Sequence, residues 1–450
     1  MRISAPRTAL AVAIAATTLA TAAAPAAPVA AATPAAPAAP AAPAAPAAPA
    51  APAAPAAPVT AAAPVNAVNA AAAAAAAVRA ASQPARNPAA ALLVLPEVSG
   101  KYSVGTRVLH LVDNHRADPW GDGKQRRELM INIWYPARTT AGHPRAPWLT
   151  PAEAGPVGSD FVQTLTGKPG VVGGVEAVRT HGALRAPVAN KPGGHPVVLF
   201  SPGFGAERNS SAALVEDLAS QGYVVVTMDH PHDAMAVEFP GGRVVPNTIN
   251  ALIEKDPNQA EKIIVKALET RVADTRFVLD ELQRRNTGWM RLDHVGMVGH
   301  SLGGATAAQV AHDDPRVVAG INMDGNPYGS VVHDGLDKPF LQVASGNTTA
   351  ENTPAWGTFT GNLRGWHREV KVAGTEHLSF HDVVLAKAKL AKLPGVAPSI
   401  IKEAFGTLDV RRTVTVERAY VSAFFDLHLR GVDRHLLDAA SPAFGEVTFI

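Results

Sequence analysis

Residues 295–305 read VGMVGHSLGGA, and they give the strongest indication of the fold of this chain. Its apolar start predicts a buried strand, and the alanine-rich segment after it predicts a helix. Between them stands G-H-S-L-G, residues 299–303, a pattern that places a serine on a sharp strand-to-helix turn with its hydroxyl above the sheet edge. Glycines are needed there because side chains would collide with the neighbouring strand or helix. The motif alone also occurs in ordinary turns, but the strand, the helix and the additional Gly304 favour Ser301 as a nucleophile.

The N-terminal 24 residues have the order of a secretory signal peptide. Arg2 and Arg7 give a basic start, an apolar stretch covers about residues 9–20, and small residues follow with a cut site near Ala22 or Ala24. The alternative is a membrane anchor, but a dozen alanine-rich residues are too few to span a bilayer. The sequence therefore predicts a secreted, extracellular protein without a stable membrane anchor.

Residues 25–90 form an Ala/Pro-rich, low-complexity linker. Proline recurs at every third position over residues 34–58, which suits an extended polyproline II spacer rather than a packed core. We expect the catalytic domain to occupy residues 91–450.

The charge balance argues against nucleic acid as a partner. The chain has 40 Lys+Arg and 38 Asp+Glu, and four of the arginines precede residue 91, so 36 basic residues face 38 acidic ones in the predicted domain. Such a balance gives no electrostatic footprint for nucleic acid or an anionic membrane. The chain contains no cysteine, which excludes disulfides, thiolate nucleophiles and cysteine metal sites.

Strand and helix patterns alternate along the predicted domain. Two alternating segments open it, and residues 137–191 are expected to be a surface excursion with short helices. Afterwards buried strands and helices succeed one another around the serine turn, which predicts a mostly parallel central sheet with helices on both faces, the α/β-hydrolase fold. The expected strands are residues 105–113, 127–135, 194–200, 223–229, 295–298, 317–323, 338–344 and 368–372, and the expected helices are residues 210–221, 256–285, 302–312 and 414–429.

A serine nucleophile needs a base and an anionic group that orients the base. In this fold they follow in the order Ser, Asp or Glu, His, at the carboxyl ends of later strands. Asp324 ends the strand after the serine turn, with Glu351 as the alternative acid. His377 follows the last predicted strand directly, with His381 as the alternative base.

Two backbone N–H groups should stabilise the oxyanion. We expect them from Leu302, after the nucleophile, and from Phe204, which lies between two glycines after the strand 194–200. His300 is expected to pack against neighbouring strands.

Other motifs give weaker predictions. Trp356, Phe359 and Trp366 lie near the expected acyl pocket and either line it or pack in the core. Residues 230–233, His-Pro-His-Asp, resemble a metal cluster but lack further ligands at convincing spacing. We therefore predict no metal site.

Four stretches resemble the platelet-activating-factor acetylhydrolase (plasma, isoform II) branch of the α/β-hydrolases, in a secreted bacterial form. They are residues 198–205, 217–223, 299–306 and 374–377. The resemblance covers about residues 95–431, although Pro202 stands where that family usually has His. The early acid, one strand after the nucleophile, also resembles that family and favours Asp324 over Glu351. The resemblance implies ester hydrolysis without metal or cofactor, on lipids with short or oxidised acyl chains.

The sequence thus predicts a secreted serine carboxylic-ester hydrolase acting on short-acyl or phospholipid-type esters through an acyl-enzyme. The alternatives are a cutinase-like polyester hydrolase and a non-catalytic surface-binding protein on its Ala/Pro stalk. The expected partner is a small-molecule ester or lipid, and the oligomeric state is left open.

Overall fold

The computed structural model describes residues 91–349 and 353–450. The predicted signal peptide, the predicted linker and the alternative acid Glu351 lie outside the described residues. The strands are β1 (Ser103–Ala117), β2 (Arg126–Ala137), β3 (Arg145–Pro147), β4 (Arg179–Leu184), β5 (His195–Ser201), β6 (Val224–Met228), β7 (Ala236–Phe239), β8 (Arg243–Pro246), β9 (Met290–His300), β10 (Val317–Met323), β11 (Phe340–Ser345), β12 (His367–Val372) and β13 (Val447–Phe449). The α-helices are α3 (Pro151–Thr166), α4 (Ala212–Ser220), α5 (Ile249–Lys255), α6 (Ala260–Arg285), α7 (Leu302–Asp313), α8 (Val331–Asp334), α9 (Pro354–Gly361), α10 (Lys387–Leu390), α11 (Pro398–Phe405) and α12 (Val410–Phe425).

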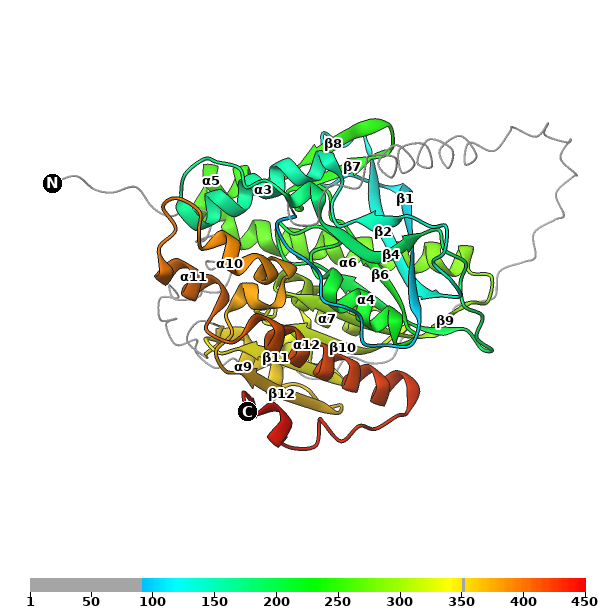
Figure 1. Cartoon of the computed structure of the whole chain (residues 1–450). Coiled ribbons are helices and arrows are strands. Elements are labelled where there is room, and N and C mark those ends of the chain that lie inside the picture. The colour runs from blue at the N-terminus through cyan, green and yellow to red at the C-terminus, as the bar shows by residue number, and fades with distance from the viewer. Residues whose placement is uncertain (1–90, 350–352) are drawn as a thin grey trace, which may run out of the picture.

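An 11-stranded sheet runs through the centre of the described chain, in the order β13-β12-β11-β10-β9-β5-β6-β2-β1-β4-β3 (Figure 1). The strands from β12 to β6 in this order all pair parallel. Antiparallel pairs join β13 to β12, β2 to β6, β1 to β2 and β3 to β4. The expected mostly parallel sheet is confirmed.

Helices cover both faces of this sheet. On one face, Leu279 of α6 and Val310 of α7 share a core with Val197 of β5. On the other face, Leu214 of α4 packs in a core with Val198, and α12 contributes to the same core. Neighbouring residues of a strand point to opposite faces, so the valine-rich strand β5 supplies both cores.

Local capping decides where two of the helices begin. Asp256, the predicted start of a long helix, accepts the N–H of Asn258 at 3.2 Å in a 3-10 turn, and α6 follows this turn from Ala260. The last long helix begins at Val410, four residues earlier than expected, because the Asp409 carboxylate accepts the N–H groups of Arg411 and Arg412.

The expectation of only short helices in residues 137–191 is wrong. Helix α3 has 16 residues, although Pro156 lies inside it. A reciprocal capping box explains its start: Thr150 Oγ1 accepts the Glu153 N–H at 3.2 Å, and Glu153 accepts the Thr150 N–H at 2.9 Å. Trp148 and Leu149 are buried in a local core with α3. In the described residues, no helix is long and apolar enough to cross a membrane.

Candidate active site

Ser301 occupies the turn between β9 and α7. Its φ of 55° and ψ of −125° are unusual for a residue with a side chain, which marks a strained turn. The Ser301 N–H donates to the carbonyl of Met323 at 2.9 Å and ties the turn to the end of β10. A Cβ on Gly299 would lie 2.0 Å from the carbonyl oxygen of Gly303, and one on Gly303 would lie 2.0 Å from that of Ser201. Both glycines of the motif are therefore sterically required.

The structure brings Ser301 together with His377 and Asp324, which follow β12 and β10. Ser301 Oγ lies 2.9 Å from His377 Nε2, and His377 Nδ1 lies 2.7 Å from Asp324 Oδ2. An ionised carboxylate only accepts, so Nδ1 carries the proton and Nε2 is free to accept the serine hydroxyl. This is the arrangement in which a histidine can take a proton from serine.

Asp324 is itself firmly held. Its Oδ1 accepts the Ser345 N–H at 2.7 Å and the Thr348 hydroxyl at 2.6 Å. Burial favours the neutral acid, but the hydrogen bond and charge of His377, together with these two donors, hold the pKa of Asp324 below its ordinary value. The carboxylate is thus ionised beside the imidazole.

The two other histidines near the site have different partners. His300 Nε2 donates to the backbone carbonyl of His377 at 2.9 Å, and the two rings lie 4.7 Å apart between centroids. Burial, followed by the neighbouring His377, lowers the pKa of His300 well below its usual value, so this ring is neutral. His381 Nδ1 accepts the Val383 N–H at 3.0 Å, and burial lowers the pKa of His381 to about 4. The Ser301 hydroxyl therefore donates to His377 and not to the alternative base His381.

Leu302 and Phe204 present backbone N–H groups beside Ser301. Leu302 is the first residue of α7, where an N–H has no partner within the helix. The Ser301 carbonyl accepts the N–H groups of Gly304 and Ala305, so the Leu302 N–H on the same peptide unit points the opposite way. Phe204 follows β5, and within residues 91–349 and 353–450 its N–H has no hydrogen-bond acceptor in the protein. Both residues line one cavity with Ser301.

This cavity has a volume of about 700 Å³ and opens over Ser301 and His377. Helix α3 and the segment after His377 supply much of its wall, and residues 203–207 and single side chains of other segments complete it. The apolar and aromatic side chains among its lining residues are Val157, Phe161, Leu165, Phe204, Ala206, Met235, Ile264, Leu302, Tyr328, Leu378, Val383, Leu390, Ala404 and Phe405.

The expectation that Trp356, Phe359 and Trp366 could line the acyl pocket needs correction, since none of them lines this cavity. Trp356 donates its indole N–H to Glu369 and is buried. Phe359 packs edge-on against Phe340, with ring centroids 5.2 Å apart. Trp366 lies against rings of the C-terminal helical segment, 5.8 Å from Phe424. These three aromatic side chains therefore pack in the core, which was the other possibility left open by the sequence.

Sequence reasoning missed a buried polar network beneath the site. Arg271 of α6 is 1% exposed and pairs with Asp233, with Nε and Nη2 at 2.7 and 2.8 Å from the two carboxylate oxygens. His230 lies between Asp274, at 3.0 Å from Nδ1, and Ser201, at 3.1 Å from Nε2. The only sequence signal was the His-Pro-His-Asp run, whose side chains serve this network and do not converge on one point.

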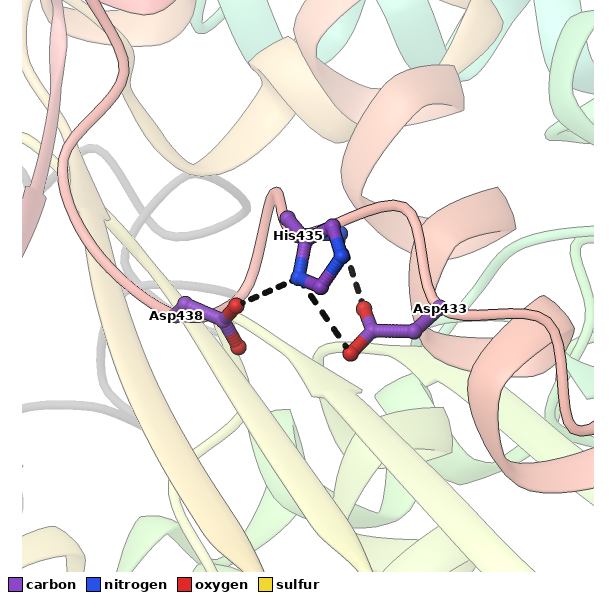
Figure 2. A group of neighbouring side chains, drawn as sticks. All are labelled: Asp433, His435 and Asp438. Atoms are coloured by element: carbon purple, nitrogen blue, oxygen red, sulfur yellow. Dashed lines mark hydrogen bonds and ion pairs between the residues drawn. The ribbon is translucent and has the colours of Figure 1, made fainter.

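One exposed group at the C-terminal end has the composition of a metal site. Asp433, His435 and Asp438 bring ligand atoms within 4.8 Å of one another (Figure 2). They already pair with one another, with His435 Nδ1 2.9 Å from Asp438 and 3.5 Å from Asp433. None of the three lines the cavity over Ser301, so the group has no part in the candidate active site.

Comparison with known families finds two matches. Residues 89–291 match the family described as platelet-activating factor acetylhydrolase, isoform II. Residues 197–440, more than half of the chain, match the alpha/beta hydrolase family.

Individual relatives are also esterases. A probable 1-alkyl-2-acetylglycerophosphocholine esterase of Arthroderma benhamiae is 28% identical over 79% of this chain and 94% of its own length. A bis(hydroxyethyl) terephthalate hydrolase of Streptomyces coelicolor is 26% identical over 36% of this chain and 41% of its own length. The solved structure of a ferulic acid esterase from Streptomyces cinnamoneus superposes with a TM-score of 0.68 at 35% identity, covering 80% of this chain and 100% of that one.

Proposed function

Because this chain belongs to the α/β-hydrolase family and is a carboxylic ester hydrolase, we propose that Ser301 is its nucleophile, His377 its general base and Asp324 the carboxylate that orients the base. The observation that carries the proposal is the pair of hydrogen bonds, 2.9 and 2.7 Å long, that joins these three side chains at the strained turn.

In the proposed reaction, Ser301 Oγ attacks the ester carbonyl carbon while His377 Nε2 takes the hydroxyl proton. The N–H groups of Phe204 and Leu302 stabilise the negative charge that develops on the carbonyl oxygen. His377 then returns the proton to the departing alcohol, which leaves an acyl group on Ser301. Water then attacks the acyl carbonyl carbon while His377 takes its proton, the bond to Ser301 Oγ breaks, and His377 returns the proton to Ser301 as the acid is released.

We propose short-acyl or phospholipid-type esters as substrates. The cavity of about 700 Å³ is within the range of small-molecule sites, and its apolar walls suit an acyl group. The similarity to the A. benhamiae esterase and to the acetylhydrolase family supports an acetyl-type ester. The signal-like order of residues 1–24 supports a secreted enzyme.

A polyester or aromatic ester is the second candidate substrate. Four aromatic side chains, Phe161, Phe204, Tyr328 and Phe405, line the cavity and could contact an aromatic ring. The similarities to a terephthalate hydrolase and to a ferulic acid esterase favour the same class.

The test is hydrolysis of p-nitrophenyl esters from acetate to palmitate by the wild type and by Ser301→Ala. We expect a maximum at two to four carbons, lost in the variant while its circular dichroism and melting temperature stay unchanged. Substantial activity of Ser301→Ala would refute the nucleophile. Faster turnover of bis(hydroxyethyl) terephthalate or methyl ferulate than of any aliphatic ester would favour the second candidate. A folded wild type that is not labelled by a fluorophosphonate probe would instead indicate a non-catalytic surface-binding protein.

A further inference from the structure

The loop that carries Phe204 is held from below by one buried ion pair. Arg271 Nη1 donates to the carbonyl of Pro202 at 2.6 Å, and Nη2 donates to the carbonyl of Gly203 at 3.0 Å. The same guanidinium pairs with both carboxylate oxygens of Asp233. Asp233 Oδ1 in turn accepts the N–H of Gly205 at 3.1 Å. The loop is therefore fixed at three backbone groups by two side chains.

These contacts determine where the Phe204 N–H points. A trans peptide unit is planar, with its C=O and N–H directed to opposite sides. The carbonyl of Gly203 and the N–H of Phe204 belong to one such unit, and the described residues contain no cis peptide bond. Two donors hold the Gly203 carbonyl toward the protein interior, Arg271 Nη2 and the Ala206 N–H at 3.1 Å, so the Phe204 N–H must point away from them, toward the cavity.

The next peptide unit is held in the same way. It contains the carbonyl of Phe204 and the N–H of Gly205, which donates to Asp233. Gly205 has a φ of 79°, a conformation that a flexible glycine loop would leave easily without such support. Both peptide units that flank the Phe204 Cα are thus fixed by the same ion pair.

We propose that Arg271 and Asp233 are positioning residues that preset the Phe204 N–H for the oxyanion. The inference rests on the proposed function, in which Ser301 attacks an ester and the oxyanion forms beside Phe204. Oxyanion donors are effective because they need no reorganisation during the reaction, and a freely rotating peptide unit would lose that advantage. Neither side chain touches the substrate in this proposal.

Arginine is required at this position because of its geometry. Its planar fork offers five N–H donors at fixed angles, and four contacts here use that fork. A lysine could keep the charge beside Asp233, but its single ammonium cannot reach both carbonyls and both carboxylate oxygens in the same directions. Arg271→Lys therefore keeps the positive charge of this residue but removes the hydrogen bonds that orient the loop.

The matched control is Arg127→Lys. Arg127 is also fully buried and pairs with Asp274 at 2.7 Å and Asp118 at 3.2 Å, but it makes no hydrogen bond to residues 202–205. If buried arginines matter here only for stability, both substitutions should have the same effect on catalysis by the folded fraction. Asp233→Asn is the second variant, because it is isosteric and tests the other half of the pair.

The experiment measures kcat and KM on p-nitrophenyl butyrate and the inhibition constant of a trifluoromethyl ketone, which forms an oxyanion adduct with a serine nucleophile. We expect Arg271→Lys and Asp233→Asn to lower kcat by about 10²-fold, the usual order for loss of one oxyanion donor, with KM changed less than threefold. The ketone should bind them more weakly by a similar factor, and Arg127→Lys should stay within threefold of the wild type.

The inference would be overturned if Arg271→Lys and Arg127→Lys lost kcat equally. It would also be overturned if the ketone inhibited Arg271→Lys and Asp233→Asn as strongly as the wild type. If Arg271→Lys does not fold, Asp233→Asn decides by the same measurements. The Ser301→Ala variant shows which hypothesis has failed. If Ser301→Ala is active, the proposed function and this inference are both wrong. If Ser301→Ala is inactive while Arg271→Lys has nearly wild-type activity, only the inference is wrong.

Discussion

Replacement of Asp324 by asparagine is the most informative single change at the candidate site. The carboxylate uses both oxygens: Oδ2 faces His377 Nδ1 at 2.7 Å, and Oδ1 accepts the Ser345 N–H and the Thr348 hydroxyl. An amide has one oxygen and one NH₂ group, so it cannot serve both sides.

The structure decides which way the amide would turn. If its NH₂ faced Ser345, a donor would meet a donor in a buried site, at a cost of about 1–3 kcal/mol for each unsatisfied group. The oxygen should therefore stay with Ser345 and Thr348, and the NH₂ should face His377. Nδ1 must then accept, the proton moves to Nε2, and Nε2 can no longer take a proton from Ser301.

We expect Asp324→Asn to lower kcat about 10³- to 10⁴-fold, or about 4–5.5 kcal/mol in the activation free energy, with little change in melting temperature. The assay is p-nitrophenyl butyrate hydrolysis at pH 7.5. Thr348→Val is the control, because it removes one donor to Oδ1 without changing the histidine tautomer, and its loss should stay within about tenfold. Activity of Asp324→Asn within tenfold of the wild type, or an equal loss in Thr348→Val, would refute this reasoning.

Three further predictions test other parts of the structure. Burial raises the pKa of Glu417 to about 8 from an ordinary value of 4.5, so the folded state keeps a proton that the unfolded chain releases, and stability falls as the pH rises through this window. Glu417→Gln should therefore gain on the order of 1–3 kcal/mol in the free energy of unfolding relative to the wild type between pH 5 and pH 8, and a pH-independent difference in urea titrations would contradict this. Gly303→Ala should fail to give a stable folded protein, whereas Gly357→Ala in α9, where an added Cβ meets no atom within 4 Å, should leave the melting temperature unchanged or slightly raised. Phe161→Ala should shift the preferred acyl chain length in the p-nitrophenyl series, while Trp366→Phe should leave the profile unchanged, because only Phe161 lines the cavity; the opposite pattern would restore the original expectation for Trp366.

The parts predicted well from the sequence are those governed by local pattern and chain order. The parallel strands are short apolar runs bounded by turn residues, and the nucleophile turn is a fixed spacing of glycines. The structure brings Ser301, Asp324 and His377 together because all three follow parallel strands, whose carboxyl ends meet at one edge of the sheet. Ser301 and Asp324 directly follow β9 and β10, and His377 follows β12 after residues 373–376.

The parts predicted poorly depend on contacts between distant segments. Proline and glycines lower the helix propensity of residues 151–166, and the capping box together with burial in a local core built from distant segments compensates for this. The cavity is lined by residues from many distant segments but not by Trp356, Phe359 or Trp366, so their position in the sequence near the last strands did not show whether they reach it. Arg271 lies on an amphipathic helix, where an arginine normally indicates the solvent-facing side.

Three adjacent strands, β9, β10 and β11, end at the candidate site. Ser301, Asp324 and Ser345 lie at these ends and are linked from strand to strand by hydrogen bonds of their N–H groups. Ser301 N–H donates to Met323, Asp324 N–H donates to Val343, and Ser345 N–H donates to the Asp324 carboxylate. Ser301 and Asp324 are thereby anchored to neighbouring strands of the sheet, whereas much of the substrate-facing wall comes from α3 and from the segment after His377. The segments that select a substrate are thus separate from the hydrogen bonds that hold the reactive side chains. A protein engineer could replace the walls by grafting while Ser301 and Asp324 keep their positions.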